Sequence, residues 1–182
     1  VPEGLCSSCE RLHTLNLPDT LVGIGAEAFQ GCPALTQLTL PSSLVYIADY
    51  AFQNDYYYRG GLNGTLLLPN TLETIGARAF ESQLLTKVAL PLLSSEGDGY
   101  PRSRLRAIGE SAFSEVPLRS MPLPQSLTRL GASAFAGNDF AHVTIPKRLQ
   151  EIPDSAFETY GRLHSTLILE FVAGSELKSI GA

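Results

Sequence analysis

The stretch LTQLTLPSSLVYIADYAF, residues 35–52, decides the fold, because two later stretches repeat its pattern. LRSMPLPQSLTRLGASAF, residues 118–135, and FAHVTIPKRLQEIPDSAF, residues 140–157, align with it without a gap. The shared pattern is L-x-x-L-x-L-P-x-x-L-x-x-I-x-x-x-A-F. Six Ala-Phe pairs mark its copies, and they end at Phe29, Phe52, Phe80, Phe113, Phe135 and Phe157. Their spacing indicates a base period of 22–23 residues, with insertions in two units.

A period of this length is typical of one coil of a leucine-rich-repeat solenoid. Apolar residues alternate in L-x-L, as in a strand with one buried face. The strand ends at a proline, which has no N–H for a ladder, and a glycine usually follows the later Ile and permits a sharp turn. The sequence predicts a right-handed leucine-rich-repeat coil with one parallel β-sheet of about seven strands. Short strands, turns or 3-10 segments are expected on the opposite side.

We expect residues 1–182 to form a single domain. A partial unit covers residues 1–11, and further units start near residues 12, 35, 62, 85, 118, 140 and 163, with Glu170 in the proline place of the last. Four apolar columns should form the core, because no coil can bury its apolar face alone. The columns are Leu15, Leu38, Leu66, Val88, Met121, Val143 and Leu167; Leu17, Leu40, Leu68, Leu90, Leu123, Ile145 and Leu169; Leu21, Leu44, Leu72, Leu105, Leu127, Leu149 and Leu177; and Ile24, Ile47, Ile75, Ile108, Leu130, Ile152 and Ile180.

The repeat resembles the BspA-like leucine-rich repeats, whose unit reads roughly LtsItlPxsvtsIgxxAFxgC. The resemblance covers essentially the whole chain, and the Asn of ordinary leucine-rich repeats is missing here as it is in that family. BspA-like proteins are typically surface or secreted proteins that bind host proteins, matrix or other cells. The resemblance therefore implies a recognition or adhesion module.

Departures from a repeat need not serve the fold, and are therefore candidate binding sites. The segment NDYYYRGG, residues 54–61, adds five residues to its unit. Tyr and Arg are enriched at binding hot spots, so Tyr56, Tyr57, Tyr58 and Arg59 are candidate partner contacts. Packing of one or two of these tyrosines on the neighbouring coil is the alternative.

Two further insertions follow Pro91 and Glu170. The first, LLSSEGDGYPRSR at residues 92–104, inserts 11 residues rich in Gly, Ser and charge. Arg102 and Arg104, with Arg106, are candidates for a small basic patch there, but a solvated loop is the favoured interpretation. The second, residues 171–176, adds four residues.

The outward side chains of the strands offer a flat surface, on which Gln37, Lys87 and His142 are candidate contacts. This face is small, polar and nearly uncharged, so it suits either a flat protein contact or stacking into a longer sheet. Its two columns are Thr14, Gln37, Thr65, Lys87, Ser120, His142 and Thr166; and Asn16, Thr39, Leu67, Ala89, Pro122, Thr144 and Ile168.

No pattern in the sequence predicts an enzyme, a cofactor or a metal. His13, His142 and His164 fall in different columns without further ligands nearby, and GIGAEA, residues 23–28, lacks the glycine spacing of a dinucleotide loop. The net charge of −5 argues against a nucleic-acid partner, and no apolar run is long enough for a membrane helix. The sequon at Asn63 would carry a glycan only in a secreted chain.

Two functions stay open. One is a recognition or adhesion module on the cell surface or in secreted form. The other is a scaffold subunit docked in a larger assembly inside the cell or an organelle. The odd number of cysteines mildly favours the second function, and the family resemblance favours the first. An open core needs a cap, so we expect more repeats or a capping chain at both ends.

The stretch CSSC, residues 6–9, has the spacing of a redox or zinc motif. Alignment of VPEGLC with IPDSAF, residues 152–157, puts Cys6 in the Phe place of a preceding unit and Cys9 in register with Cys32. The favoured interpretation is that these cysteines pack as small apolar residues. A disulfide from Cys6 to Cys9 or from Cys9 to Cys32 stays open, and zinc is disfavoured because no second ligand pair exists.

Overall fold

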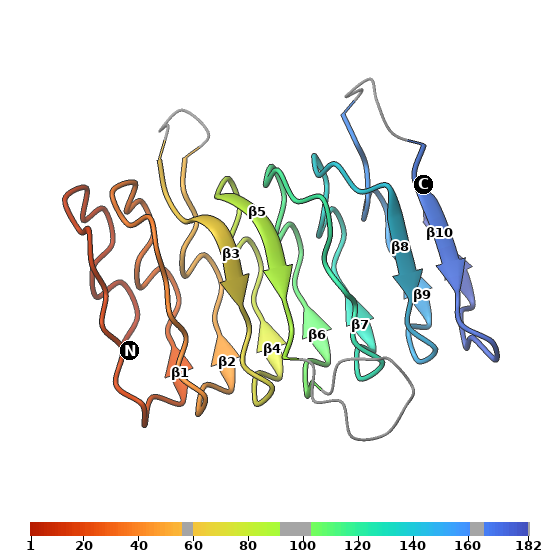
Figure 1. Cartoon of the computed structure of the whole chain (residues 1–182), viewed down its shortest axis with the longest axis horizontal. Helices are drawn as coiled ribbons and strands as arrows, with labels where there is room; N and C mark the ends of the chain where they lie inside the picture. The colour runs from red at the N-terminus through yellow and green to blue at the C-terminus, as the bar shows by residue number, and fades with distance from the viewer. Residues whose placement is uncertain (56–59, 92–102, 161–165, 182) are drawn as a thin grey trace.

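A computed structural model describes residues 1–55, 60–91, 103–160 and 166–181. The chain winds into coils that stack side by side along the long axis, from the N-terminus to the C-terminus (Figure 1). All paired strands are parallel, and the described residues form strands, turns and bends without a helix. The predicted solenoid of parallel strands is confirmed.

The most regular coil-to-coil bonding lies at the Ala-Phe turn, where no strand is assigned. In each coil the N–H of the residue in the Phe place donates to the carbonyl of the Ala place in the next coil, at 2.8–2.9 Å. This series runs without a break through six successive pairs of coils. The donor and acceptor pairs are Cys6–Ala28, Phe29–Ala51, Phe52–Ala79, Phe80–Ala112, Phe113–Ala134 and Phe135–Ala156.

Left-handed backbone conformations make this ladder possible. The residue two places before each Phe has a φ of 52–59°, and in the first five of these six coils it also donates its N–H to the next coil. In those coils the N–H groups of the left-handed residue and of the Phe two places later point to the same neighbouring coil. None of the six is glycine, although a left-handed residue with a side chain is disfavoured by about 1 kcal/mol or more. They are Glu27, Tyr50, Arg78, Ser111, Ser133 and Ser155.

The rings of the Ala-Phe pairs form one continuous stack behind this ladder. Ring centroids of successive phenylalanines lie 5.2–5.6 Å apart, with interplanar angles of 3–15°. Stacked, offset aromatic pairs each contribute about 0.5–1.5 kcal/mol beyond the burial of their area. The stack contains Phe29, Phe52, Phe80, Phe113, Phe135 and Phe157.

A second ladder runs through two-residue strands at the Ile places. These strands are β1 (Gly23–Ile24), β2 (Tyr46–Ile47), β4 (Thr74–Ile75), β6 (Ala107–Ile108), β7 (Arg129–Leu130), β9 (Glu151–Ile152) and β11 (Ser179–Ile180). The first five form one sheet in the order β1-β2-β4-β6-β7, and they lie in a row in Figure 1. A Cβ on Gly25, Gly76 or Gly109 would lie under 3.0 Å from backbone atoms of the preceding coil, so the glycine column allows this close approach.

The second ladder breaks where proline replaces that glycine. The N–H of Gly131 donates to the carbonyl of Ile108 at 2.9 Å, whereas Pro153, in the same place of the next coil, has no N–H to donate. Strand β9 accordingly pairs with β11 and not with β7.

The L-x-x-L-x-L stretch forms four longer strands. They are β3 (Asn63–Leu67), β5 (Leu84–Ala89), β8 (His142–Ile145) and β10 (Ile168–Phe171). They make two separate pairs, β3–β5 and β8–β10, so this stretch differs from the predicted single sheet of about seven strands. The continuous sheet lies instead at the short strands, where the glycine column brings the coils closest together.

The pairing register matches the alignment in most coils. Leu66 lies beside Val88, and Ile24, Ile47 and Ile75 lie in one row. In the last long strand, however, Leu169 pairs with Val143, whereas the alignment placed it beside Ile145. Glu170 therefore does not sit in the proline place. A shift of two residues keeps every side chain on the same face, so the apolar alternation could not reveal it.

The predicted apolar columns form the core. Their members in the middle coils are buried, apart from the partly buried Leu38 and Leu130. In the first coil Ile24 is buried, and the remaining members of the first and the last described coils are partly buried. Ile180 is the exception, because its side chain is 59% exposed. A side chain in a solenoid is buried by the coils on both sides of it, and Ile180 has a described coil on one side only.

In three coils a buried hydrogen-bond donor lies three residues after the Phe place, whereas Val116 fills the same place of another coil. Cys32 donates its thiol to the carbonyl of Cys6 at 3.2 Å, and Gln83 donates its side-chain amide to the carbonyl of Phe52. Asn138 donates to the carbonyl of Phe113 at 2.7 Å. In all three cases the acceptor is the Phe-place carbonyl of the preceding coil. In these three coils the place holds a buried donor, and cysteine is one of the residues that fill it.

We predict that Glu27→Gly stabilises the protein by up to about 1 kcal/mol, because glycine removes the strain of a left-handed residue. Glu27 is exposed, so the loss of its side chain affects no packing. Urea unfolding measures the change. The matched control is Glu158→Gly, at an exposed position whose φ is not positive, where we expect destabilisation of up to about 1 kcal/mol. Destabilisation by Glu27→Gly would contradict the prediction.

We predict that Cys32→Asn keeps the stability of the protein within about 0.5 kcal/mol, since Asn138 already fills the equivalent place. Cys32→Val should lower the free energy of unfolding by about 1–2 kcal/mol, because the buried carbonyl of Cys6 loses its side-chain donor. Thermal and urea unfolding of both variants test this. If Cys32→Val has a higher free energy of unfolding than Cys32→Asn, the donor role of Cys32 is excluded.

Candidate functional site

Several residues that the sequence singled out lie outside the described residues. Tyr56, Tyr57, Tyr58, Arg59 and Arg102 are among them, so their role stays a prediction.

The strand-face candidates are placed by the structure. Gln37, Lys87 and His142 are all exposed. Lys87 on β5 lies beside Thr65 on β3, whereas His142 belongs to the separate β8–β10 pair. Arg104 is exposed, and its N–H donates to the carbonyl of Asn70 at 3.0 Å.

A polar hollow of about 620 Å³ opens at the turn side of the first coils. Its walls come from successive turns that follow the Phe places, so residues far apart in the sequence meet there. The lining residues are Ser8, Gln30, Gly31, Gln53, Asn54, Asp55, Glu81, Ser82 and Glu115. With three carboxylates and no cationic side chain among these residues, the lining is negative at neutral pH.

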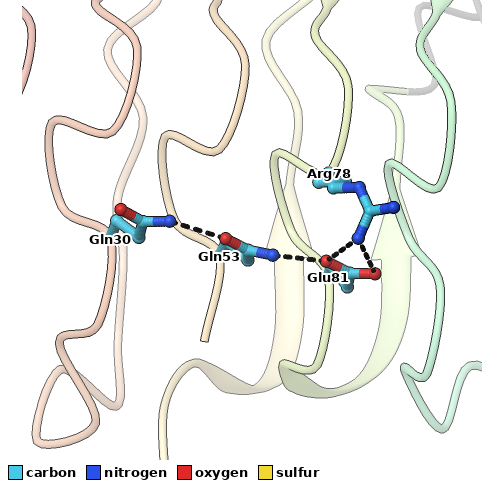
Figure 2. Close-up of polar contacts among 4 residues, drawn as sticks. All are labelled: Gln30, Gln53, Arg78 and Glu81. Atoms are coloured by element: carbon cyan, nitrogen blue, oxygen red, sulfur yellow. Dashed lines mark hydrogen bonds and ion pairs between the residues drawn. The ribbon is translucent and has the colours of Figure 1, made fainter. Parts of the chain in front are cut away.

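A ladder of side chains crosses this hollow (Figure 2). Gln30 donates its Nε2 to Oε1 of Gln53 at 2.7 Å, and Gln53 donates its Nε2 to Oε2 of Glu81 at 2.5 Å. Arg78 donates to both carboxylate oxygens of Glu81, at 3.2 and 3.3 Å. The three ladder residues each follow directly after a Phe, in three successive coils. Parallel stacking therefore places their side chains in line.

The carboxylate at the end of this ladder is partly shielded. The side chain of Glu81 is 15% exposed and that of Arg78 is 40% exposed. An ion pair this open to solvent contributes at most about 1 kcal/mol to stability. Its main effect is to fix the direction of the ladder: each amide turns its Nε2 toward Glu81. At the other end, Oε1 of Gln30 accepts no bond from the described residues and faces the first coil.

The tyrosine-bearing segment leaves the solenoid at the rim of the hollow. Asn54 and Asp55, its first residues, both line the hollow. The side chain of Asn54 is buried and donates to the carbonyl of Gly60 at 3.1 Å, which ties the two ends of the segment together. Gly61 then donates its N–H to the carbonyl of Pro33 at 2.7 Å. These bonds fix the base of the segment beside the Gln ladder.

The strand face carries a second, smaller hollow of about 330 Å³ between residues 37–39 and β3. Gln37, Asn63 and Thr65 line it. This face is less polar than predicted, because Leu67 is 57% exposed and Ile168 is 45% exposed. A flat protein contact there would bury these two side chains.

The alignment contained a signal for the hollow. Gln30, Gln53 and Glu81 stand in the same place of three successive units, directly after Phe. Comparing the polar residues of that column, as was done for the apolar columns, would have predicted a polar row. The hollow itself was missed, because its depth depends on the left-handed turns.

Among the described residues, no group of three or more His, Cys, Asp or Glu side chains is arranged to hold a metal ion. The same residues include no helix that is long and apolar enough to span a membrane.

Comparisons with known proteins give a family and a fold. A search of curated proteins finds no match. A leucine-rich repeat protein from T. pallidum has a solved structure with 24% identity and a TM-score of 0.55, which covers 100% of this chain and 65% of that one. That likeness supports the fold alone.

Two further solved structures are less similar. A leucine-rich cell surface protein from Faecalibacterium prausnitzii shares 16% identity at a TM-score of 0.46, over 99% of this chain and 62% of that one. The pneumococcal vaccine antigen PcpA shares 19% identity at a TM-score of 0.47, over 93% of this chain and 55% of that one. The chain thus spans less than two thirds of the length of each of these proteins.

The family assignment rests on the repeat itself. A family model of the BspA type leucine-rich repeat region, in 6 copies, matches residues 1–96 and 100–181. This match covers nearly the whole chain and the same repeat that the Ala-Phe pairs mark. The protein belongs to the family of BspA type leucine-rich repeat regions.

Proposed function

We propose that the protein is a non-catalytic recognition module that binds a protein partner through the polar hollow and the inserted segment at its rim. The observation that carries the proposal is the position of Asn54 and Asp55, which both line the hollow and begin the segment with three tyrosines. A repeat that only served the fold would need neither the insertion nor the Gln ladder beside it.

The chemistry of the hollow suits a partner surface rich in hydrogen-bond donors. Carboxylates and amide oxygens are acceptors, and Asp55, Glu81 and Glu115 give the lining a negative charge. Lys and Arg side chains on the partner would complement it, and the tyrosines of the inserted segment would add apolar contact area at a low entropic cost. We therefore expect the affinity to fall as the salt concentration rises.

A surface or secreted location is part of the proposal, and it rests on the family. The partners that fit such a location are matrix proteins and the surface proteins of other cells. An intracellular scaffold is the alternative, and the exposed Leu67 and Ile168 on the strand face favour it, because a flat apolar contact suits a permanent assembly.

The experiment is a binding screen of the immobilised chain against purified matrix and cell-surface proteins. For any protein bound, Gln53→Ala should weaken the affinity tenfold or more, because it removes both bonds of the ladder, and replacing Tyr56, Tyr57 and Tyr58 together by Ser should do the same. The matched control is Gln150→Ala, at a glutamine whose only described side-chain partner is Lys178 at 2.9 Å, in the short-strand part of its coil.

The outcome separates the two functions. The proposal is supported if the hollow variants lose binding while Gln150→Ala binds with unchanged affinity. Unchanged binding in both hollow variants, with a loss in Leu67→Ser, would assign the contact to the strand face. Failure to bind any protein of the panel would contradict the surface-recognition function.

A further inference from the structure

Three thiols meet in the first two coils. The N–H of Cys9 donates to the carbonyl of Cys6 at 3.2 Å and closes a four-residue turn, in which Ser8 has a φ of 59°. The first and last Cα atoms of such a turn lie within about 7 Å of each other. A disulfide spans Cα atoms about 4.4–6.8 Å apart, so the turn holds Cys6 and Cys9 at a distance that a disulfide can bridge.

The side chains of Cys6 and Cys9 also face each other. Burial and a hydrogen bond that the Cys6 thiol donates to the Cys9 sulfur both raise the pKa of Cys6 above its ordinary value. Both side chains are partly buried, so an oxidant can reach them more readily than it can reach Cys32, which is 3% exposed.

Cys32 is held in place by a different role. Its thiol donates to the carbonyl of Cys6 at 3.2 Å and also lies 3.9 Å from the carbonyl oxygen of Gln30. Burial raises the pKa of Cys32 to about 11, so the thiolate that would attack a disulfide is scarce at neutral pH. To pair with Cys9, the sulfur would have to leave both bonds and abandon the Cys6 carbonyl.

We infer that Cys6 and Cys9 form a reversible dithiol–disulfide couple across this turn, while Cys32 remains a reduced thiol. With a small disulfide such as oxidised glutathione as the oxidant, two exchange steps join the sulfurs of Cys6 and Cys9. The protein loses two hydrogen atoms, and two molecules of the small thiol are released. The inference does not depend on the proposed partner.

The couple borders the polar hollow. Ser8 lies inside the turn, lines the hollow and donates its N–H to the carbonyl of Gln30 at 2.7 Å. Oxidation would add a covalent bond across the turn that contains Ser8, and this turn is the wall of the hollow that Oε1 of Gln30 faces. Reduction leaves that wall held by hydrogen bonds alone.

The test uses the whole chain, equilibrated with reduced and oxidised glutathione in large excess. Free thiols are blocked in the folded state, and again after unfolding with a second reagent, and peptides are mapped by mass spectrometry. We expect one intramolecular bond, between Cys6 and Cys9, with Cys32 labelled only after unfolding. Cys9→Ser should abolish the bond. Cys32→Asn should change the oxidation equilibrium less than threefold.

Each other outcome overturns the inference. A disulfide from Cys32 to Cys6 or Cys9 would show that the hydrogen bond to the Cys6 carbonyl does not keep the Cys32 sulfur in place. Glutathione attached to single cysteines without a cross-link would show that the turn does not bring Cys6 and Cys9 together. A fully reduced protein in oxidised glutathione would show that the couple does not form. The map of the unchanged protein decides among these outcomes even if a variant fails to fold.

Discussion

The structure depends on one constraint, the shape of the Ala-Phe turn. A left-handed residue stands two places before each Phe, the N–H groups of the turn point toward the next coil, and the phenyl rings stack behind them. Every other feature tolerates interruption: the short-strand ladder breaks at Pro153, and the long strands form two separate pairs. The backbone bonds of the Ala-Phe turn continue through all six successive pairs of coils. Small Ala leaves room for the close backbone contact, and Phe supplies the apolar area.

Much of this fold could be predicted from the sequence, because each repeat of a solenoid buries the same positions for the same physical reason. The apolar columns, the register of β3 with β5 and the glycine turns all followed from the alignment. Two features did not follow from it, and a third was overlooked. Glu27 and Ser133 give no sign that their places are left-handed, since glycine is absent from them. The two-residue shift at Leu169 preserves the apolar alternation. The break at Pro153 was readable, because a proline in the glycine place removes a known donor.

The candidate site was only half predictable. The insertion after Asn54 was found because it interrupts the period, and Tyr and Arg pointed to recognition. The hollow beside it is lined by residues of five successive coils, and only parallel stacking brings Gln30, Gln53 and Glu81 into one row. The stacking of the coils also changes the interpretation of the three cysteines. The place of Cys32 is a donor place that Gln83 and Asn138 also fill, whereas Cys6 and Cys9 face each other across a turn.

Native-state hydrogen exchange at the Phe amides tests the central claim most directly. If the Ala-Phe turn holds the coils together, the amides of Phe52, Phe80 and Phe113 exchange only when the whole protein unfolds. Their exchange free energies should then agree with the free energy of global unfolding within about 1 kcal/mol. Exchange of these amides through local opening, at a free energy well below that of amides in β3 and β5, would contradict the account.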